Sequence, residues 1–513
     1  MEKKLTATEI WDKYQAGVDH HRKNFLYTKV DKCHRFYEGD QWRDQHGSIG
    51  EDLPVYNIIE TIVNYKASMI AQNSMVIVYS PHEGREGEQE VCDLLNAHAE
   101  KKWDKLKMDG VLWDAVKEAA ITGDSFLYFF DDSLRCQMVD SDSVFLGDEQ
   151  QQDIQKQPYI ILYERRLVSD VREDARNSGM DEEEVMQIVP DDESVNYLAH
   201  DEVKTQAAEK CSVLRYISKD EYGNVQFCEC TKTVMLKEMA SIMGMTHYPI
   251  AKYTWKRQFR SSRGVGEVLR LIPNQVEINK TLYRRLEAMK AVAFPKPVYV
   301  EGLIENPDNI TTVGSPVRVR EGSVQKVQEV FTYLQPAQMS GDAKALQDEM
   351  LETTRELANA GDNALGNINP EQASGAAIVA VKDAQAVPLN EQKAAAKQFV
   401  EDIAIIWLDT LTAYNTNGLQ TEQGMITGEM LAGFEPEIRI DVSDGNPFSI
   451  MNKIQQLENA LAAGYITFEE FTEHLPETGH TAKGEFEDIL KEREAQMMAQ
   501  MMPQMNSSMM PMV

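Results

Sequence analysis

The spacing of hydrophobic residues predicts a helix at the start of this chain. Its apolar side chains recur at helical intervals, namely Trp11, Tyr14, Val18 and Phe25. Thr6 and Glu9 have the spacing of a capping box just before this stripe. The helix is expected to end in the segment 36–42, where Gly39 and the polar residues after it form a turn.

Shorter elements are expected up to about residue 255. Pro54 opens a second helix that runs to about Asn73, and a third helix spans roughly 88–121. Runs of β-branched and aromatic residues predict strands, with a hairpin turn at 220–224, and these strands lie at 76–79, 126–130, 159–163 and 213–217. Two acidic clusters, at 181–184 and 191–193, are expected to be solvated surface.

Long amphipathic helices dominate the second half. The segment 264–293 carries one apolar face, made of Ile278, Leu282, Leu286, Met289 and Ala293. Pro273 either starts this helix or kinks it. Four basic residues lie away from the apolar stripe: Lys280, Arg284, Arg285 and Lys290. A compact β-like segment follows at 298–330, and a helix resumes over 343–360 with Leu346, Met350 and Leu357 in phase.

The polar segment 361–375 separates two long helical stretches. It is broken by Gly, Asn and Pro and contains no Lys or Arg. An Ala-rich helix is expected after it, over 374–414, with a kink at Pro388. A strand at 436–442, helices at 448–463 and 467–500 and a frayed Met-rich tail complete the pattern. A loop in this position suggests a part that projects into a pore rather than an active site.

Composition bounds the function. A chain of 513 residues is too long for one core, so several subdomains are expected. No run of eighteen apolar residues exists, so no contact with a membrane is expected. The first ten residues lack the apolar core of a secretory signal, and six Cys are too sparse for a disulfide framework, which fits a reducing cytoplasm. The net charge of −31 opposes non-specific binding of nucleic acid.

Candidate chemistry is weak. Asp140 and Asp142 form an acidic pair that suits a metal, but a surface turn is the simpler interpretation. Cys228 and Cys230 face the same side of a strand and are expected to be buried, idle thiols, because no second ligand pair lies near them. The His residues at 20, 21 and 34 are expected to be solvated or packed, and Gly264-Val265-Gly266 is expected to be a flexible entry to a helix. No catalytic, cofactor-binding or metal-binding residue is therefore expected.

The order of these segments resembles that of the portal proteins of tailed double-stranded DNA phages. The resemblance covers nearly the whole chain and is carried by six short segments: Phe36-Tyr37-Glu38-Gly39-Asp40-Gln41-Trp42, Leu53-Pro54-Val55-Tyr56-Asn57-Ile58-Ile59, Gly123-Asp124-Ser125, Val268-Leu269-Arg270-Leu271-Ile272-Pro273-Asn274-Gln275-Val276-Glu277-Ile278-Asn279-Lys280, Ala373-Ser374-Gly375-Ala376-Ala377-Ile378 and Tyr465-Ile466-Thr467. Each motif is short and degenerate, and their joint order is more specific than any one of them.

The resemblance implies an α+β, predominantly helical portal fold with wing, stem, clip and crown subdomains. These would be a wing at 1–263, a first stem helix at 264–293, a clip at 294–337, a second stem helix at 338–360, a tunnel loop at 361–374, a kinked helix with a returning wing strand at 375–447, crown helices at 448–500 and a disordered tail at 501–513.

The same resemblance implies a non-enzymatic role. The chain would form a ring, usually of twelve subunits, at one capsid vertex of the virion, after assembly in the host cytoplasm. Double-stranded DNA would pass through its channel during packaging and ejection. The implied partners are the large terminase, the major capsid and scaffold proteins and the head–tail adaptor proteins, and no cofactor is implied.

Three sets of site residues follow from the resemblance. The tunnel loop would line the channel with Asn363, Leu365, Asn367, Ile368, Asn369 and Gln372. The clip would contact the terminase or the connectors through Arg318, Arg320 and Glu321. The four basic stem residues would face DNA or, preferentially, pair between subunits with acidic groups, namely Asp348, Glu349, Glu352 and Glu356.

Two other interpretations stay open from the sequence. One is a different oligomeric ring of a phage neck or tail, against which the order of helix, β-like insert, helix, loop and long kinked helix favours a portal. The other is a metal-dependent hydrolase around Asp140 and Asp142.

Overall fold

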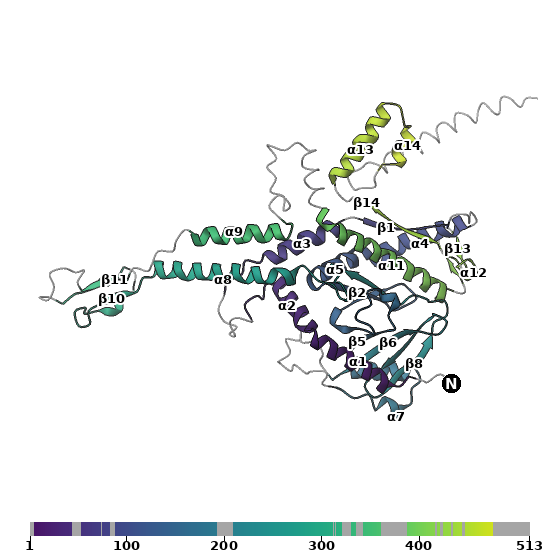
Figure 1. The fold of residues 1–513 in the computed structure, drawn as a ribbon, viewed down its shortest axis with the longest axis horizontal. Helices are drawn as coiled ribbons and strands as arrows, with labels where there is room; N and C mark the ends of the chain where they lie inside the picture. Colours follow the sequence, from purple (N-terminus) through teal and green to yellow (C-terminus); the bar gives the residue numbers. More distant parts are fainter. Residues whose placement is uncertain are drawn as a thin grey trace, which may run out of the picture.

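The computed structural model of the chain shows a body of helices and sheets from which a long helical hairpin projects (Figure 1). It describes residues 5–43, 53–72, 74–82, 88–191, 209–310, 312, 314–320, 330–334, 342–360, 387–415, 418–420, 424–431, 434, 436–443 and 447–475. Helices and antiparallel strands both contribute, with more residues in helices, as expected for an α+β chain.

The largest hydrophobic core lies among helices of the body, together with the first turns of the projecting helix α8. The body helices of this core are α2 (Leu26–Glu38), α3 (Ile58–Ala71), α4 (Gln89–Leu106), α5 (Met108–Thr122) and α11 (Asn390–Tyr414). Their apolar residues recur at helical spacing, so each helix buries one stripe. Trp103 of α4 packs edge-on against Trp407 of α11 with ring centroids 6.0 Å apart.

Two of the expected long helices are each divided in the structure. The opening helix is α1 (Ala7–Lys23) followed by α2, because Phe25 between them has a φ of 56° and a side chain that is 67% exposed. The prediction that Phe25 belongs to the buried stripe is therefore wrong. The helix expected over 88–121 is broken in the same way at Lys107, whose φ is 54°. A left-handed residue ends the run of helical hydrogen bonds and redirects the chain.

The capping box at the start of α1 is confirmed. The backbone N–H of Glu9 donates to Oγ1 of Thr6 at 3.3 Å, and the backbone N–H of Thr6 donates to Oε2 of Glu9 at 3.0 Å. Two N–H groups that the first turn leaves unpaired are thereby satisfied.

A five-stranded antiparallel sheet forms the lower part of the body, in the order β4-β5-β6-β7-β8 (Figure 1). Its strands are β4 (Val144–Leu146), β5 (Tyr159–Leu167), β6 (Lys210–Lys219), β7 (Val225–Cys230) and β8 (Met235–Ser241). The expected hairpin joins β6 to β7: the carboxylate of Asp220 accepts from the N–H groups of Tyr222 and Asn224, and Gly223 supplies a φ of 87°. Helix α1 buries Tyr14 against this sheet, and Cys228 and Cys230 are buried in the same cluster, as predicted.

Short helices lie beside this sheet. They are α6 (Val168–Asn177) and α7 (Glu182–Val185). The acidic residues at 181–184 are exposed, as expected. Asp191 is not simply solvated, because its carboxylate accepts from the backbone N–H of Ser212 at 2.7 Å and lies 3.5 Å from Arg165.

Two smaller sheets also belong to the body. One has the order β3-β2-β9, made of β3 (Cys136–Val139), β2 (Asp124–Phe129) and β9 (Ile250–Thr254). The other pairs β1 (Ser74–Ser80) with β14 (Glu437–Ser443) in antiparallel register, with Ile77 opposite Ile440. The strand predicted at 436–442 is thus confirmed, and it lies against a strand from the first hundred residues.

The hairpin that projects from the body consists of α8 (Val268–Ala293) and α9 (Asp342–Leu357), which run side by side to the left in Figure 1. Pro273 lies inside α8 and does not start it. At the far end, β10 (Pro297–Tyr299) pairs with β11 (Phe331–Tyr333), and an isolated bridge joins Ile304 to Val319. The segment between the two helices is therefore a small β-containing tip.

The last described elements of the chain lie between Val387 and Glu473. Pro388 lies in a 3-10 turn (Val387–Leu389) directly before α11, so the described part of that helix is not kinked by it. After the small elements β12 (Leu419–Gln420), β13 (Met425–Ile426) and α12 (Gly428–Leu431), the chain forms α13 (Pro447–Ala462) and α14 (Phe468–Glu473). The helix expected over 467–500 ends at Glu473, and the residues after 475 lie outside the described part, as does the Met-rich tail.

Candidate functional site

The contact between the two helices of the hairpin is polar. Gln347 and Thr354 of α9 are buried, with 6% and 2% exposure. The side-chain amide of Asn274 donates to Oγ1 of Thr354 at 3.1 Å, and Arg285 donates to the side-chain oxygen of Gln347. These contacts hold α9 antiparallel to α8.

Large apolar side chains instead lie on the outside of the hairpin. The most exposed are Met289, Val292 and Phe294 on α8 and just after it, and Leu346 and Leu357 on α9. Their exposed fractions run from 51% for Leu346 to 80% for Phe294. The stripe residues Leu286, Met289, Leu346 and Leu357 are all exposed within one copy of the chain. Exposed apolar rows of this kind mark an interaction surface.

The basic residues of α8 have local partners. Nζ of Lys280 lies 2.9 Å from Glu277, and Nζ of Lys290 lies 3.0 Å from Glu287, each one turn earlier on the same helix. Arg285 contacts Gln347, as described, and Arg284 is exposed. Such exposed pairs contribute little stability.

The tip presents its predicted contact residues to solvent. Arg318 and Arg320 are exposed, while their backbone groups are fixed: the N–H of Arg318 donates to Oδ1 of Asn306 at 2.7 Å, and the N–H of Arg320 donates to the carbonyl of Leu303 at 3.0 Å. Glu321 lies outside the described residues. Two guanidinium groups on a held backbone suit recognition of carboxylates.

The base of the hairpin is held by a buried network of side-chain amides. Gln275 and Asn279 lie one turn apart on α8 with at most 2% exposure. The amide of Gln275 donates to the carbonyl of Tyr56 at 2.7 Å and its oxygen accepts from the N–H of Ile58 at 3.2 Å. Asn279 accepts from the N–H of Tyr56 at 3.1 Å and donates to Oε1 of Gln41 at 2.6 Å. The network joins α8 to the segments before and after residues 44–52.

A second joint lies just before α8. An added Cβ on Gly264 would meet the carbonyl oxygen of Gly123 at 2.5 Å, and one on Gly266 would meet that of Ile121 at 2.4 Å. The two glycines are therefore required by close backbone packing, and the expectation of a merely flexible entry is wrong. The backbone N–H of Gly264 donates to Asp124 at 2.7 Å, which completes this contact.

A buried ion pair braces the same region. Nζ of Lys66 on α3 lies 2.8 Å from Glu267, and both side chains are less than 10% exposed. Burial lowers the pKa of Lys66, an effect that Glu267 opposes. The indole N–H of Trp255 also donates to Glu267 at 3.3 Å. Breaking a pair of this kind leaves an uncompensated charge inside the protein.

These joints unite four of the short segments singled out in the sequence. Residues 36–42, 53–59 and 268–280 meet in the amide network, and 123–125 meets the glycines before α8. Their shared role was not read from the sequence. One feature of the sequence could have revealed the network. Gln275 and Asn279 fall on the same helix face as Leu271 and Ile278, where apolar residues are expected.

The residues predicted for the tunnel loop cannot be placed. Asn363, Leu365, Asn367, Ile368, Asn369 and Gln372 all lie outside the described residues.

The surface turn expected for the acidic pair is confirmed for Asp140, which is exposed, and is wrong for Asp142. Asp142 is 1% exposed within a 3-10 turn (Ser141–Ser143), and burial followed by the charge of Asp140 raises its pKa to about 6. Partial desolvation of its carboxyl group, followed by the charge of Glu118, raises the pKa of Asp140. Among the described residues, no group of three or more His, Cys, Asp or Glu side chains is placed to hold a metal ion.

The histidines serve packing and pairing. His21 is buried, stacks on Phe145 at 4.6 Å and contacts Glu149 at 3.3 Å, while His34 contacts Glu118 at 3.1 Å. Within the described part of the chain, no helix combines the length and apolar character needed to cross a membrane.

Comparison with known protein families assigns the chain. It matches the family described as "Phage P22-like portal protein" over residues 11–194 and 130–429. The chain belongs to the phage P22-like portal protein family. Membership places it in the virion, at the portal vertex of a phage capsid, and the family is a structural, non-enzymatic one.

Other comparisons are more distant. A solved structure titled "Neck of native GTA particle computed with C12 symmetry" is 11% identical in sequence, with a TM-score of 0.33. The match covers 82% of this chain and 90% of the chain in that structure. A search of curated proteins finds no match.

Proposed function

We propose that this portal-family chain forms a closed ring, expected to hold twelve copies, whose axial channel carries double-stranded DNA during genome packaging and ejection. The observation that supports this most directly is the projecting hairpin of α8 and α9. Its helices bury Gln347 and Thr354 where they meet, and farther from the body they expose Met289, Val292 and Leu346. A second copy packed beside them would exclude water from those apolar side chains.

In this proposal, the stems 264–293 and 338–360 pack side by side around the channel. Met289 and Val292 of one copy contact Leu346 or Leu357 of the next. Lys280, Arg284, Arg285 and Lys290 then pair with the acidic groups of a neighbouring α9, namely Asp348, Glu349, Glu352 and Glu356, which are all exposed. Repeated heterologous contacts of this kind close into a ring.

The tunnel loop, 361–374, is proposed to meet the DNA at the narrowest part of the channel. Its polar residues without Lys or Arg make loose contacts, since each phosphate contact adds affinity that slows passage. Each chain has a net charge of −31, so twelve copies have a net charge of about −372. The DNA is therefore repelled from most of the ring.

The tip of the hairpin, the clip at 294–337, is proposed to dock first the large terminase and later the head–tail adaptor proteins. Arg318, Arg320 and Glu321 would supply charged contacts. Residues 1–263 and 375–447 would form the wing, and 448–500 the crown within the capsid. Scaffold and major capsid proteins would contact this body during assembly in the host cytoplasm. ATP hydrolysis belongs to the terminase, consistent with the lack of a P-loop in this sequence.

Negative-stain microscopy of the purified chain tests the ring directly. The proposal predicts ring-shaped particles with a central channel for the wild-type chain. Met289→Glu combined with Leu346→Glu should leave folded single copies, because a buried unpaired carboxylate costs more than the lost apolar contact stabilises. Rings of undiminished number from this variant would show that the outer faces of the hairpin do not form the subunit contact.

A further inference from the structure

One edge of the five-stranded sheet is open among the described strands. β8 is the last strand in the order β4-β5-β6-β7-β8, and within the described residues no strand pairs with its outer side. β8 lies in the part of the body away from the projecting hairpin (Figure 1). At the other end of the sheet, β4 has only three residues, and all of them are buried. An open strand of seven residues offers a row of backbone N–H and C=O groups to an extended chain.

A charged side chain does not close this edge. Lysines that extend past an edge strand commonly prevent further pairing. Nζ of Lys237, in the middle of β8, lies 2.9 Å from Oε2 of Glu229 on the neighbouring strand β7. The ammonium group is therefore held over β7, on the face of the sheet, and does not block the outer side of β8.

Apolar side chains along β8 are only partly covered. Met235 and Met239 pack against the cluster beneath α1, and Leu236 packs against the cluster that includes α6. All three side chains are partly exposed. Side chains of paired strands lie about 5 Å apart, so a strand added to β8 would cover these residues further.

Exposed apolar side chains flank the start of β8. Met186 and Val189, which follow α7, are 56% and 52% exposed. The carbonyl of Gln187 between them accepts from the hydroxyl of Thr233 at 2.9 Å. This hydrogen bond places the segment beside the first residues of the strand, so a chain paired with β8 would meet both side chains.

The other end of β8 is flanked in the same way. Met243, just after the strand, and Tyr222, on the β6–β7 turn, are 82% and 89% exposed. The N–H of Ile242 donates to the carbonyl of Val225 at 2.8 Å, which holds the two turns beside each other. Large exposed apolar side chains around an unpaired edge mark an interaction surface.

The charge around the edge favours one kind of partner. The segments 181–189, 219–222 and 232–241 contain seven acidic and three basic residues. A basic segment is therefore attracted, whereas a second copy of this chain, with its net charge of −31, is repelled. A nucleic acid carries phosphates of the same sign as this surface and has no peptide groups that could extend the ladder.

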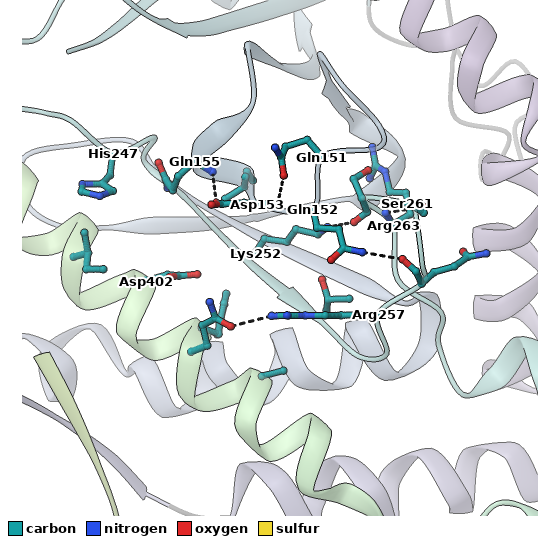
Figure 2. Close-up of a pocket in the computed structure, with 18 of the residues that line it drawn as sticks. Gln151, Gln152, Asp153, Gln155, His247, Lys252, Arg257, Ser261, Arg263 and Asp402 are labelled. Atoms are coloured by element: carbon teal, nitrogen blue, oxygen red, sulfur yellow. Dashed lines mark hydrogen bonds between the residues drawn. The ribbon is translucent and has the colours of Figure 1, made fainter. Parts of the chain in front are cut away.

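A cavity elsewhere in the body makes no comparable demand. It measures about 560 Å³ and lies between α11, the segment 151–155 and the loop 257–263 (Figure 2). Burial raises the pKa of Asp402 there to about 7, and the charges of His247 and Arg257 oppose the rise. The cavity thus supplies its own counter-charges, unlike the open backbone of β8.

We propose that the outer edge of β8 is a docking site for an extended, basic segment of a different protein. This segment pairs with β8 as a sixth strand and lays apolar side chains against Met186 and Val189 at one end and against Tyr222 and Met243 at the other. The site needs no ring, because one folded copy presents all of it.

Hydrogen exchange followed by mass spectrometry tests the pairing. The full-length chain is mixed with a peptide of about nine residues that alternates Lys and Val and is long enough to span β8. Because an added strand pairs with the outer N–H groups of β8, exchange in 235–241 should slow by about tenfold or more at saturating peptide. Exchange in β3 (Cys136–Val139), an edge strand of another sheet, is the internal control and should not change.

A second peptide separates strand pairing from attraction by charge alone. The same sequence with every backbone nitrogen methylated keeps its charges but donates no backbone hydrogen bond. It should leave exchange in 235–241 unchanged. Equal slowing by both peptides, equal slowing in β3, or no slowing by either peptide would overturn the proposal.

Substitutions at the two ends of β8 test the apolar contacts. Met186→Ala combined with Met243→Ala should weaken binding of the Lys–Val peptide about tenfold, and both side chains are exposed, so the fold does not depend on them. Tyr465→Ala, at a side chain 83% exposed between α13 and α14, is the matched control and should bind like the wild type. A double variant that binds as tightly as this control would contradict the proposed site.

The chain without peptide distinguishes the other occupants. If exchange in 235–241 is already as slow as in the central strand β6 at every concentration, the chain itself covers the edge. If it slows only as the concentration of the chain rises, a second copy covers it. Either result would overturn the docking site and leave the proposed ring untouched, whereas chains that bind the peptide but never form rings would refute the ring alone.

Discussion

The side-chain amide of Asn279 donates a hydrogen bond to the side-chain oxygen of Gln41 at 2.6 Å, although 238 residues separate them in the chain. Asn279 also accepts from the backbone N–H of Tyr56. Because both residues are buried, the contact contributes to holding the body end of the projecting helix against the N-terminal helices.

Replacing Asn279 should loosen this root. Asn279→Ala leaves the N–H of Tyr56 and the oxygen of Gln41 without partners inside the protein, which costs about 2 to 4 kcal/mol. Hydrogen exchange followed by mass spectrometry should show faster exchange in the segment 53–60 than in the wild type. Asn177→Ala, at an exposed helix end, serves as the control. Equal protection of 53–60 in the two variants would mean that the network does not hold the stem.

Replacing a glycine by alanine should change the stability of the chain in opposite directions at Gly266 and at Gly110. Gly266→Ala forces a Cβ to 2.4 Å from the carbonyl oxygen of Ile121, so the backbone must shift, and a loss of about 2 to 3 kcal/mol is expected. Gly110→Ala, within α5 and with nothing inside 4 Å, should instead stabilise the helix by about 0.5 to 1 kcal/mol. Thermal unfolding measures both. A neutral Gly266→Ala would contradict the close packing.

Asp402 and Asp409, two turns apart on α11, should respond to pH in opposite ways. The pKa of Asp402 is raised by burial from 3.8 to about 7, so its charge destabilises the fold above pH 7, and the penalty disappears as pH falls toward 4. Asp402→Asn should therefore stabilise dilute, unassembled chains at pH 8 by about 2 kcal/mol, less than the roughly 4 kcal/mol of the full shift because solvent reaches the side chain.

Asp409→Asn is the matched control. Burial would raise the pKa of Asp409, but hydrogen bonds from His247 and Thr246 lower it. Its contribution to stability is present above pH 4 and lost below, so Asp409→Asn should destabilise the chain at pH 8. Calorimetry at pH 8 and pH 4 compares the two variants. A stability gain from Asp402→Asn that persists undiminished at pH 4 would contradict the assignment of its cause.

Deleting Asn363 to Gln372 tests the tunnel loop. Rings should still form, because the proposed stem contacts lie elsewhere, while DNA packaging or retention should fall. Electron microscopy counts the rings, and the DNA content of particles assembled with the variant measures packaging. Loss of the rings themselves would mean that the segment is structural, contrary to the proposed role.

Local pattern predicted much of the fold. The capping box at Thr6, the hairpin at Asp220 and the strand at 436–442 each depend on neighbouring residues or on a period of two, so the sequence carries their signal. The helix breaks at Phe25 and Lys107 have no such signal. Neither residue is Gly, Asn or Asp, which are the residues that normally adopt a positive φ.

The pattern of apolar residues in α8 and α9 could not predict which of their side chains are buried, for a different reason. Periodicity shows which residues share a face but not what covers that face. Leu346 and Leu357 are in phase yet exposed, while Gln347 and Thr354 are buried between the helices. The cavity beside Asp402 was also missed, because it is assembled from three segments, near 153, 257 and 402, that meet only in the fold.

Native mass spectrometry of the purified chain tests the central claim most directly. With a chain mass of 58.2 kDa, a closed ring of twelve copies should appear near about 700 kDa, with no ladder of open intermediates, because closure satisfies every heterologous contact at once. A single species at the mass of one chain or of two, unchanged as the concentration rises, would contradict the account.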